Sequence, residues 1–432
     1  MNFLTLERIM KQLSIFLSAF AAVLTVAGAG FFDFPEDKGR ALPADKVYPN
    51  GRIFPIMTYT GGSKSEQLRK DGFTVVGPVY GKNHDGAMEN AHKFGMPMIF
   101  SIRAKQDGVS VDKNFLRRSG IKPDPAKLTE SIRNIVKDAV KKYPEIAFFY
   151  VTPEELRHWK SKEYDFIKLA IDAVHSTGVK QPLWMYTPGH YGQDSLSKYA
   201  DRLDVMGKGC YTNYSGYKNN RVWIRHSVTI MKNAAATGSE VDLVLAVLEM
   251  FRTPEQSEIP MIPRWARHDF YASLIEGAKG LAIFSLSRRK GFAEAHTLYY
   301  GAYSQAAKEV TGKNGLGEIF LFGERRQDVK WRVSSGNAQI KLQVPARAKD
   351  PAKAKFFTYP SVGIADIAHA RGRYLFMVNS DNADISGVIS GMPAGTVVKD
   401  AVTGEKIAVA ENGSVKLTFK ALEVKLFKLE RN

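Results

Sequence analysis

From Ile53 to Val310 the chain alternates short apolar segments with amphipathic ones, and it completes this alternation eight times. Strands alternating with helices are typical of a parallel α/β sheet. The strands are predicted at 53–59, 73–79, 97–103, 147–151, 182–186, 204–210, 242–248 and 281–286. The helices are predicted at 63–70, 86–94, 128–142, 164–176, 195–200, 222–236, 264–277 and 295–310. Eight consecutive units, with no glycine-rich phosphate turn after the first strand, favour a closed (β/α)8 barrel over a doubly wound sheet.

The pattern changes from about Glu318 onward, where short apolar segments are separated by Gly, Asn, Asp and Pro turns and helical periodicity is absent. Such spacing is typical of an antiparallel sandwich. The strands here are predicted at 319–322, 329–333, 338–344, 374–379, 387–389, 396–400, 404–409 and 415–429. We therefore predict an α/β fold in which a (β/α)8 TIM barrel at 53–315 is followed by a small antiparallel β-sandwich domain at 316–432.

The N-terminus has the layout of a secretory signal peptide. Lys11 is followed by an apolar run from Leu13 to Val26 and then by the small residues Ala27-Gly28-Ala29, which form a cleavage pattern. The run is too short for a good membrane span. We expect a signal peptide at 1–29, an irregular lead-in segment at 30–52, and a secreted or periplasmic protein without stable membrane insertion after cleavage.

The charge and the cysteine content restrict the kinds of partner and of stabilising bond that the chain can have. The formal net charge is +17 and there is one cysteine, so no intramolecular disulfide and no cysteine-rich zinc motif can form. The basic residues are scattered, and no nucleic-acid motif is present. The basic charge leaves an acidic polysaccharide as a candidate partner. His84, His158 and His190 lack metal-like spacing, so we expect no metal and no cofactor. The oligomeric state stays open.

Barrel enzymes build their sites from the C-terminal ends of the strands. The fourth strand runs into Thr152-Pro153-Glu154-Glu155, and the seventh ends at Glu249. Glycosidic cleavage needs two carboxyl groups, one to protonate the leaving oxygen and one to attack or to activate water. Either Glu154 or Glu155 faces the site, because neighbouring strand residues point in opposite directions. The alternative is that these two acids begin the next helix, where they complement its dipole.

Aromatic and polar side chains are also expected at the strand ends. Aromatic rings with polar tips can stack on the apolar faces of sugars while bonding to their hydroxyl groups. Each aromatic taken alone could equally be a packing residue. The predicted substrate-binding residues are Tyr59, Arg103, Trp159, Trp184, Tyr186, His190, Tyr211 and Asn213.

With these acids in place, the barrel resembles the 4/7 superfamily of retaining glycosidases over residues 51–312. The segment at 268–281 also looks like the strand-seven-to-eight region of many glycosidases that carry C-terminal sandwiches. The resemblance implies that Glu154 or Glu155 is the acid/base and that Glu249 is the nucleophile. This chain differs from that superfamily in having Pro153 before Glu154, where the superfamily usually has Asn before its acid/base.

The sequence therefore predicts a secreted glycoside hydrolase that acts on a poly- or oligosaccharide, acidic and sulfated glycans included, by a two-carboxylate retaining mechanism. Two alternatives stay open: a non-catalytic glycan-binding barrel, and a polysaccharide lyase that would use His190 and Tyr211. Acids at both strand ends favour the hydrolase, since a binding module needs neither. In that mechanism an ionised Glu249 should raise the pKa of the strand-four acid.

Overall fold

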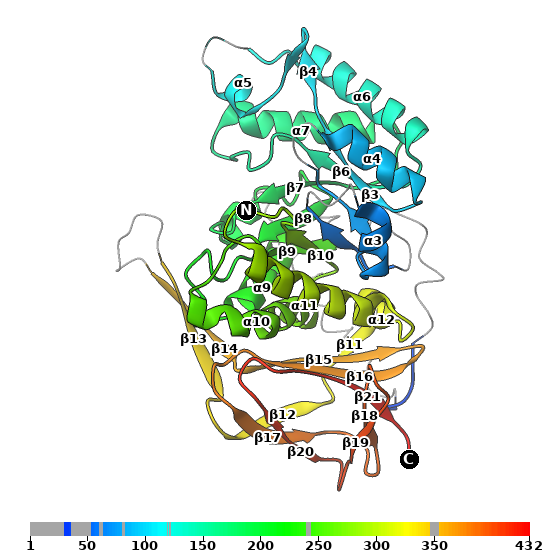
Figure 1. The fold of residues 1–432 in the computed structure, drawn as a ribbon, viewed down its shortest axis with the longest axis vertical. Helices are drawn as coiled ribbons and strands as arrows, with labels where there is room; N and C mark the ends of the chain where they lie inside the picture. Colours follow the sequence, from blue (N-terminus) through cyan, green and yellow to red (C-terminus); the bar gives the residue numbers. More distant parts are fainter. Residues whose placement is uncertain are drawn as a thin grey trace, which may run out of the picture.

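The computed structural model describes residues 30–35, 53–59, 64–79, 83–118, 120, 122–238, 243–345 and 354–432. Its upper part in Figure 1 is built around a closed barrel of parallel strands, which confirms the predicted fold class. Around the barrel the order is β1 (Ile56–Thr58), β2 (Val75–Val76), β3 (Met98–Ile102), β6 (Ile146–Val151), β7 (Leu183–Thr187), β8 (Val205–Gly209), β9 (Leu243–Glu249) and β10 (Gly280–Phe284). Strand β10 closes the barrel by pairing with β1.

Helices cover the outside of the barrel. They are α3 (Ser65–Lys70), α4 (His84–Lys93), α6 (Pro125–Lys142), α7 (Ser161–His175), α8 (Gln193–Leu196), α9 (Trp223–Ala235), α10 (Ile262–Glu276) and α11 (Ala293–Thr311), with the 3-10 helix η3 (Gln256–Met261) before α10. Successive residues of a strand point to opposite faces. On β9, therefore, Leu245 and Val247 fill the barrel, whereas Val244 and Ala246 pack under the helices.

The segment between β3 and α6 is more structured than the loop that the sequence predicts. It contains the short hairpin β4 (Lys105–Gln106) and β5 (Val109–Ser110), and then the helix α5 (Lys113–Arg117). The buried carboxylate of Glu163 on α7 accepts hydrogen bonds from Arg117 and Arg157. This buried acceptor ties α5 to the outer helices beside the end of β6.

The C-terminal region is a sandwich of two antiparallel sheets, as predicted. The larger sheet has the order β11 (Glu324–Arg326), β15 (Val362–His369), β16 (Gly372–Asn379), β21 (Val424–Glu430), β18 (Val397–Asp400) and β19 (Lys406–Val409). The smaller sheet has the order β12 (Lys330–Ser335), β17 (Ile385–Ser390) and β20 (Val415–Phe419). Side chains such as Met377, Ile389 and Phe419 pack between the two sheets.

The larger sheet also packs against the barrel. Figure 1 shows α10, α11 and α12 (Leu316–Phe322) between the barrel strands and this sheet. Strand β16 is buried on both faces, because Tyr374 and Phe376 join the barrel-side core while Met377 joins the sandwich core. The prediction of a strand at 319–322 is wrong, since this segment lies within α12. A short, fully apolar segment carries no periodicity that separates a helix from a strand.

A two-stranded hairpin extends from the sandwich along the barrel. Its strands are β13 (Gln339–Val344) and β14 (Lys355–Pro360), and the sequence did not predict β14 or β15. The inner face of the hairpin, which includes Leu342, packs on Trp223 at the start of α9. The hairpin therefore contacts the segment that links β8 to α9.

The predicted signal peptide at 1–29 lies outside the described residues. Of the lead-in segment, residues 30–35 are described, and Phe31 packs against the sandwich with its carbonyl accepting a hydrogen bond from Arg373. Within the described ranges, none of the helices combines the length and apolar character needed to cross a bilayer.

Candidate active site

A cavity of about 230 Å³ lies at the C-terminal mouth of the barrel. It is formed by residues at or just after the ends of β1, β6, β7, β8, β9 and β10. Its lining consists of Tyr59, Glu154, Glu155, Tyr186, Tyr211, Tyr214, Phe251, Phe284 and Arg289. Five of the residues predicted from the sequence therefore line a single cavity.

Glu154 is held by a tyrosine from within the barrel. The hydroxyl of Tyr150 donates a hydrogen bond to the Glu154 carboxylate. Tyr150 lies on β6, and its side chain belongs to the barrel interior. The same hydroxyl accepts a hydrogen bond from the backbone N–H of Tyr186 at 3.3 Å and lies 3.5 Å from the Tyr59 hydroxyl. Tyr150 thus links Glu154 to two strands that line the cavity.

Glu155 has a different set of contacts. Its carboxylate forms an ion pair with Lys113 of α5 at 2.9 Å. Its φ is 57°, a left-handed conformation that is uncommon and strained for a residue with a side chain. At this turn Glu154 bonds to the inward-facing Tyr150, whereas Glu155 pairs with Lys113 in the segment between β3 and α6. The two adjacent acids are therefore not equivalent.

Glu249 lies at the end of β9, on the same face as Leu245 and Val247. Its Oε2 accepts hydrogen bonds from the backbone N–H groups of Asn213 and Tyr214, at 2.9 and 3.0 Å. The side chain is nearly enclosed, since the residue is 4% exposed. Oε1 is buried and has no hydrogen-bond partner within the described part of the chain. Burial raises the pKa of Glu249 to about 7, against the opposing effect of these two amides and of Arg221.

Glu249 is not among the residues that line the cavity; it is buried in the wall that they form. Tyr214, whose N–H bonds to Glu249, lines the cavity, and so does Phe284, which is the neighbour of Glu249 in the β9–β10 ladder. Phe251, two residues later, lines it as well. Glu154 therefore lies at the cavity surface, and Glu249 lies in the wall, next to residues that line the cavity.

The rest of the wall is aromatic. The rings of Tyr186 and Tyr211 stack at 6.2 Å, and Phe284 meets Tyr59 edge to face at 5.0 Å. Burial raises the pKa of both Tyr186 and Tyr211 well above the usual value. Their hydroxyl groups are therefore neutral at physiological pH and can donate hydrogen bonds.

Five of the eight predicted binding residues lie outside the cavity lining. Trp184 is 0% exposed and packs inside the barrel against Tyr150, at 4.9 Å between ring centroids. It cannot contact a substrate in this structure, so its prediction is corrected to a barrel-core role. Arg103 and His190 are exposed. Trp159, which is 45% exposed, contacts the ring of Tyr191. The eighth predicted residue, Asn213, holds Glu249 through its backbone.

Sequence reasoning missed several residues that form the site. Tyr150 could have been found from the alternation of β6, because it shares the inward face with Phe148. Phe251 and Phe284 follow or end a barrel strand and could have been included on the same rule. Arg289 lines the cavity from the loop after β10, with its guanidinium 5.4 Å from the centroid of Phe251. No sequence signal distinguishes it from its basic neighbours Arg288 and Lys290.

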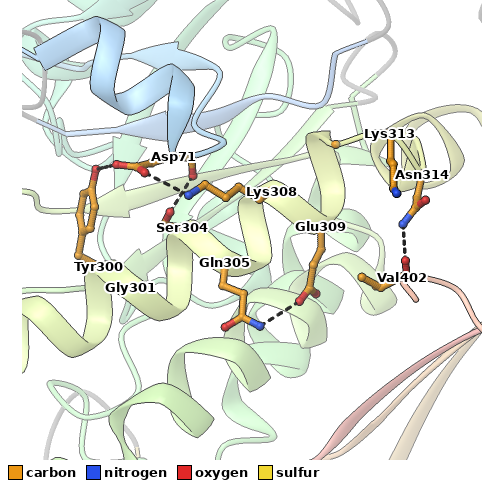
Figure 2. A pocket seen from close by; sticks show the side chains of 11 residues that line it. Asp71, Tyr300, Gly301, Ser304, Gln305, Lys308, Glu309, Lys313, Asn314 and Val402 are labelled. Carbon is orange, nitrogen blue, oxygen red and sulfur yellow. Dashed lines mark hydrogen bonds and ion pairs between the residues drawn. The ribbon is translucent and has the colours of Figure 1, made fainter. Parts of the chain in front are cut away.

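Larger surface depressions exist elsewhere, and Figure 2 shows one of about 790 Å³ along α11. Its polar side chains bond mainly to one another. The carboxylate of Asp71 accepts hydrogen bonds from Tyr300 at 2.6 Å and from Lys308 at 3.2 Å, and Ser304 donates to the Asp71 carbonyl. These contacts join α3 to α11, so we interpret this groove as a helix junction.

Metal-ligating side chains do not gather in the part of the chain that the structure describes: no group of three or more His, Cys, Asp or Glu residues is arranged to hold an ion. The chemistry that the cavity residues can supply is proton transfer, carboxylate attack and hydrogen bonding.

Comparisons with known proteins show similarity of fold only. No protein-family model matches the chain, and no curated protein matches it. Among solved structures, the chain is similar to an α-amylase from Anoxybacillus, with a TM-score of 0.54 and 9% identity over 88% of this chain and 98% of that one. It is also similar to an α-amylase from Geobacillus thermoleovorans complexed with acarbose, with a TM-score of 0.53 and 9% identity over 90% and 100% of the two chains.

A third similar structure is an α-amylase from Malbranchea cinnamomea, with a TM-score of 0.50 and 11% identity over 88% of this chain and 97% of that one. At these identities the likeness establishes a shared fold over almost the whole of both chains. The arrangement of a barrel followed by a sheet domain is therefore common to this chain and to these enzymes.

Proposed function

We propose that this chain is a glycoside hydrolase that cleaves a poly- or oligosaccharide with two carboxyl groups, Glu154 and Glu249. The observation that supports it most is a cavity at the C-terminal barrel mouth that has an aromatic wall, an acid at its surface and a second acid within its wall. The similar folds of named glycoside hydrolases support the same proposal.

The proposed reaction retains the configuration at the anomeric carbon. Glu154 protonates the glycosidic oxygen while the carboxylate of Glu249 attacks the anomeric carbon, which gives a glycosyl-enzyme and a free alcohol. This attack requires the cavity wall to open over Glu249, whose carboxylate it covers in this structure. Water, deprotonated by Glu154, then displaces Glu249 and restores both groups. We choose Glu154 over Glu155 because Tyr150 orients it from inside the barrel, whereas Glu155 is paired with Lys113.

The cavity wall also bears on the substrate. Tyr186 and Tyr211 offer flat apolar faces with hydroxyl tips, which suits the C–H faces and hydroxyl groups of a sugar ring. Arg289 adds a positive charge to the lining, and the whole chain carries a net charge of +17. For this reason the proposed substrates include acidic and sulfated glycans. We also propose export, on the basis of the signal-like segment at 1–29.

The decisive experiment is a screen of the purified mature chain against neutral, acidic and sulfated polysaccharides and against aryl glycosides. We expect release of reducing ends from one glycan class, and proton NMR of the first product should show retained anomeric configuration. Glu249→Gln should abolish turnover and leave binding intact. Glu154→Ala should impair poor leaving groups far more than activated aryl leaving groups, which need little protonation.

Binding without turnover by the wild type would instead identify a glycan-binding barrel. Unsaturated products that absorb in the ultraviolet would identify a lyase. The leader is tested by mass analysis of the N-terminus of the exported chain, which should begin near Gly30.

A further inference from the structure

A chain of buried polar side chains runs from the site to the sandwich. It begins at Asn213, whose backbone N–H holds Glu249, and whose side-chain oxygen accepts a hydrogen bond from Arg221 at 3.0 Å. The Asn213 amide group also donates to the hydroxyl of Tyr299 at 2.9 Å. Both ends of the Asn213 side chain are therefore fixed, and they fix the loop that presents the backbone donor.

The chain continues through a fully enclosed ion pair. Arg221 donates from two nitrogens to the carboxylate of Asp269 on α10, which also accepts a hydrogen bond from Thr212 at 3.0 Å. The Nδ1 of His268 lies 2.9 Å from Asp269, and its Nε2 lies 3.1 Å from the Ser380 hydroxyl of the sandwich. All of these residues except Asn213, which is half-buried, are buried.

The same pair of helices contains a natural comparison. Arg225 lies one helical turn after Arg221, is buried, and pairs with the carboxylate of Glu276 on α10 at 3.1 Å. It also contacts the sandwich, by donating to the carbonyl of Pro360 at 2.6 Å. Arg225 therefore also pairs with a carboxylate of α10, but within the described part of the chain none of its hydrogen bonds or ion pairs leads to Asn213 or Glu249.

We propose that Asn213 and Arg221 are positioning residues, which fix the two backbone N–H groups that hold Glu249. The proposal rests on the catalytic role proposed for Glu249. A bidentate arginine is suited to the task, because its planar fork holds a carboxylate and an amide oxygen in one geometry and lysine cannot reproduce it. Displacement of a reacting group by about 1 Å can reduce a rate by about 100-fold.

The experiment compares Arg221→Lys with the matched variant Arg225→Lys in the full mature chain. We expect both to lower the thermal midpoint. Only Arg221→Lys should lower kcat, by about 10- to 100-fold, with KM changed by less than about threefold. Asn213→Ala, which keeps the backbone N–H and the Arg221–Asp269 pair, should lower kcat in the same way and serves if Arg221→Lys does not fold.

A second readout does not require activity. Titration of the Glu249 carboxyl is followed by NMR of glutamate labelled at the carboxyl carbon, with Glu249→Gln giving the assignment. Poorer alignment of the two amides stabilises the ionised form less, so the pKa of Glu249 should rise in Arg221→Lys and stay unchanged in Arg225→Lys. If the wild type hydrolyses no glycan, this titration still tests the positioning, while the proposed function fails on its own. An unchanged titration in both Arg221→Lys and Asn213→Ala, or equal effects of the two arginine variants, would overturn the proposal.

Discussion

Tyr150 and Glu154 lie four residues apart, and the hydroxyl of one donates to the carboxylate of the other at the mouth of the barrel. Tyr150 is the last inward-facing residue of β6, and Glu154 follows a turn that begins at Thr152. The strand thereby supplies both the acid and the group that orients it. This relationship requires the turn, because a regular strand would carry residue 154 about 13 Å beyond residue 150.

We expect Tyr150→Phe to lower kcat by about tenfold or more, since catalytic groups depend on such orientation. The backbone N–H of Tyr186 also loses its hydroxyl acceptor, which should cost about 1–3 kcal/mol of unfolding free energy. Steady-state kinetics and urea unfolding measure the two effects. Thr229→Val, which removes a partly buried hydroxyl that bonds to Glu276 on the outer helices, is the control and should leave kcat unchanged.

The pH dependence of kcat/KM tests the role of Glu249. Burial raises the pKa of this group to about 7, so in the free enzyme it becomes ionised only as the pH passes through that value. A nucleophile must be ionised, and we therefore expect kcat/KM to rise with pH up to a limb near 7. A profile that falls through 7 and shows no rising limb there would mean that Glu249 acts as the proton donor, with Glu154 as its ionised partner.

Glu249→Gln should change stability in a pH-dependent way. The pKa of Glu249 is raised from 4.5 to about 7 on folding, so the stability that it contributes is fully present below about 4.5 and is lost as the pH rises through 7. The shift corresponds to at most about 3 kcal/mol. Urea unfolding should show the variant to be similar to the wild type at pH 5 and more stable by about 1–3 kcal/mol at pH 8. If the difference in unfolding free energy between the variant and the wild type were the same at pH 5 and pH 8, the raised pKa would be contradicted.

Patterning along the chain was sufficient to predict the barrel, the sandwich and the strand ends that carry Glu154 and Glu249, because hydrophobic periodicity reports which face of an element is buried. It failed where a residue's depth matters. Trp184 and Tyr186 are both inward-facing residues of β7, but Tyr186 lines the cavity while Trp184 packs one layer deeper. Alternation gives the face and not the layer.

The burial and hydrogen-bond partners of the two acids could not be predicted from the sequence either. We expected an ionised Glu249 that raises the pKa of the strand-four acid, whereas burial raises the pKa of Glu249 itself. Its enclosure depends on Tyr214 and on the buried network behind Asn213, in which Arg221 and Asp269 come from segments 48 residues apart. Neither residue lies at a strand end, so the rule that locates barrel sites does not find them.

The last prediction separates the two adjacent acids. Glu155 holds a left-handed φ of 57° and pairs with Lys113 at 2.9 Å while partly exposed. Glycine adopts this φ without strain, at the cost of greater freedom in the unfolded chain, and a partly exposed ion pair contributes about 0–1 kcal/mol. Glu155→Gly should therefore change the unfolding free energy by no more than about 1 kcal/mol.

The kcat/KM of Glu155→Gly should stay within about fivefold of the wild type, whereas Glu154→Ala should lose about 100-fold or more on substrates with poor leaving groups. The measurement is kcat/KM for matched aryl glycosides of high and low leaving-group pKa. A leaving-group dependence that steepens in Glu155→Gly and not in Glu154→Ala would transfer the acid/base role to Glu155, because only loss of the proton donor makes the rate depend on the leaving group in this way.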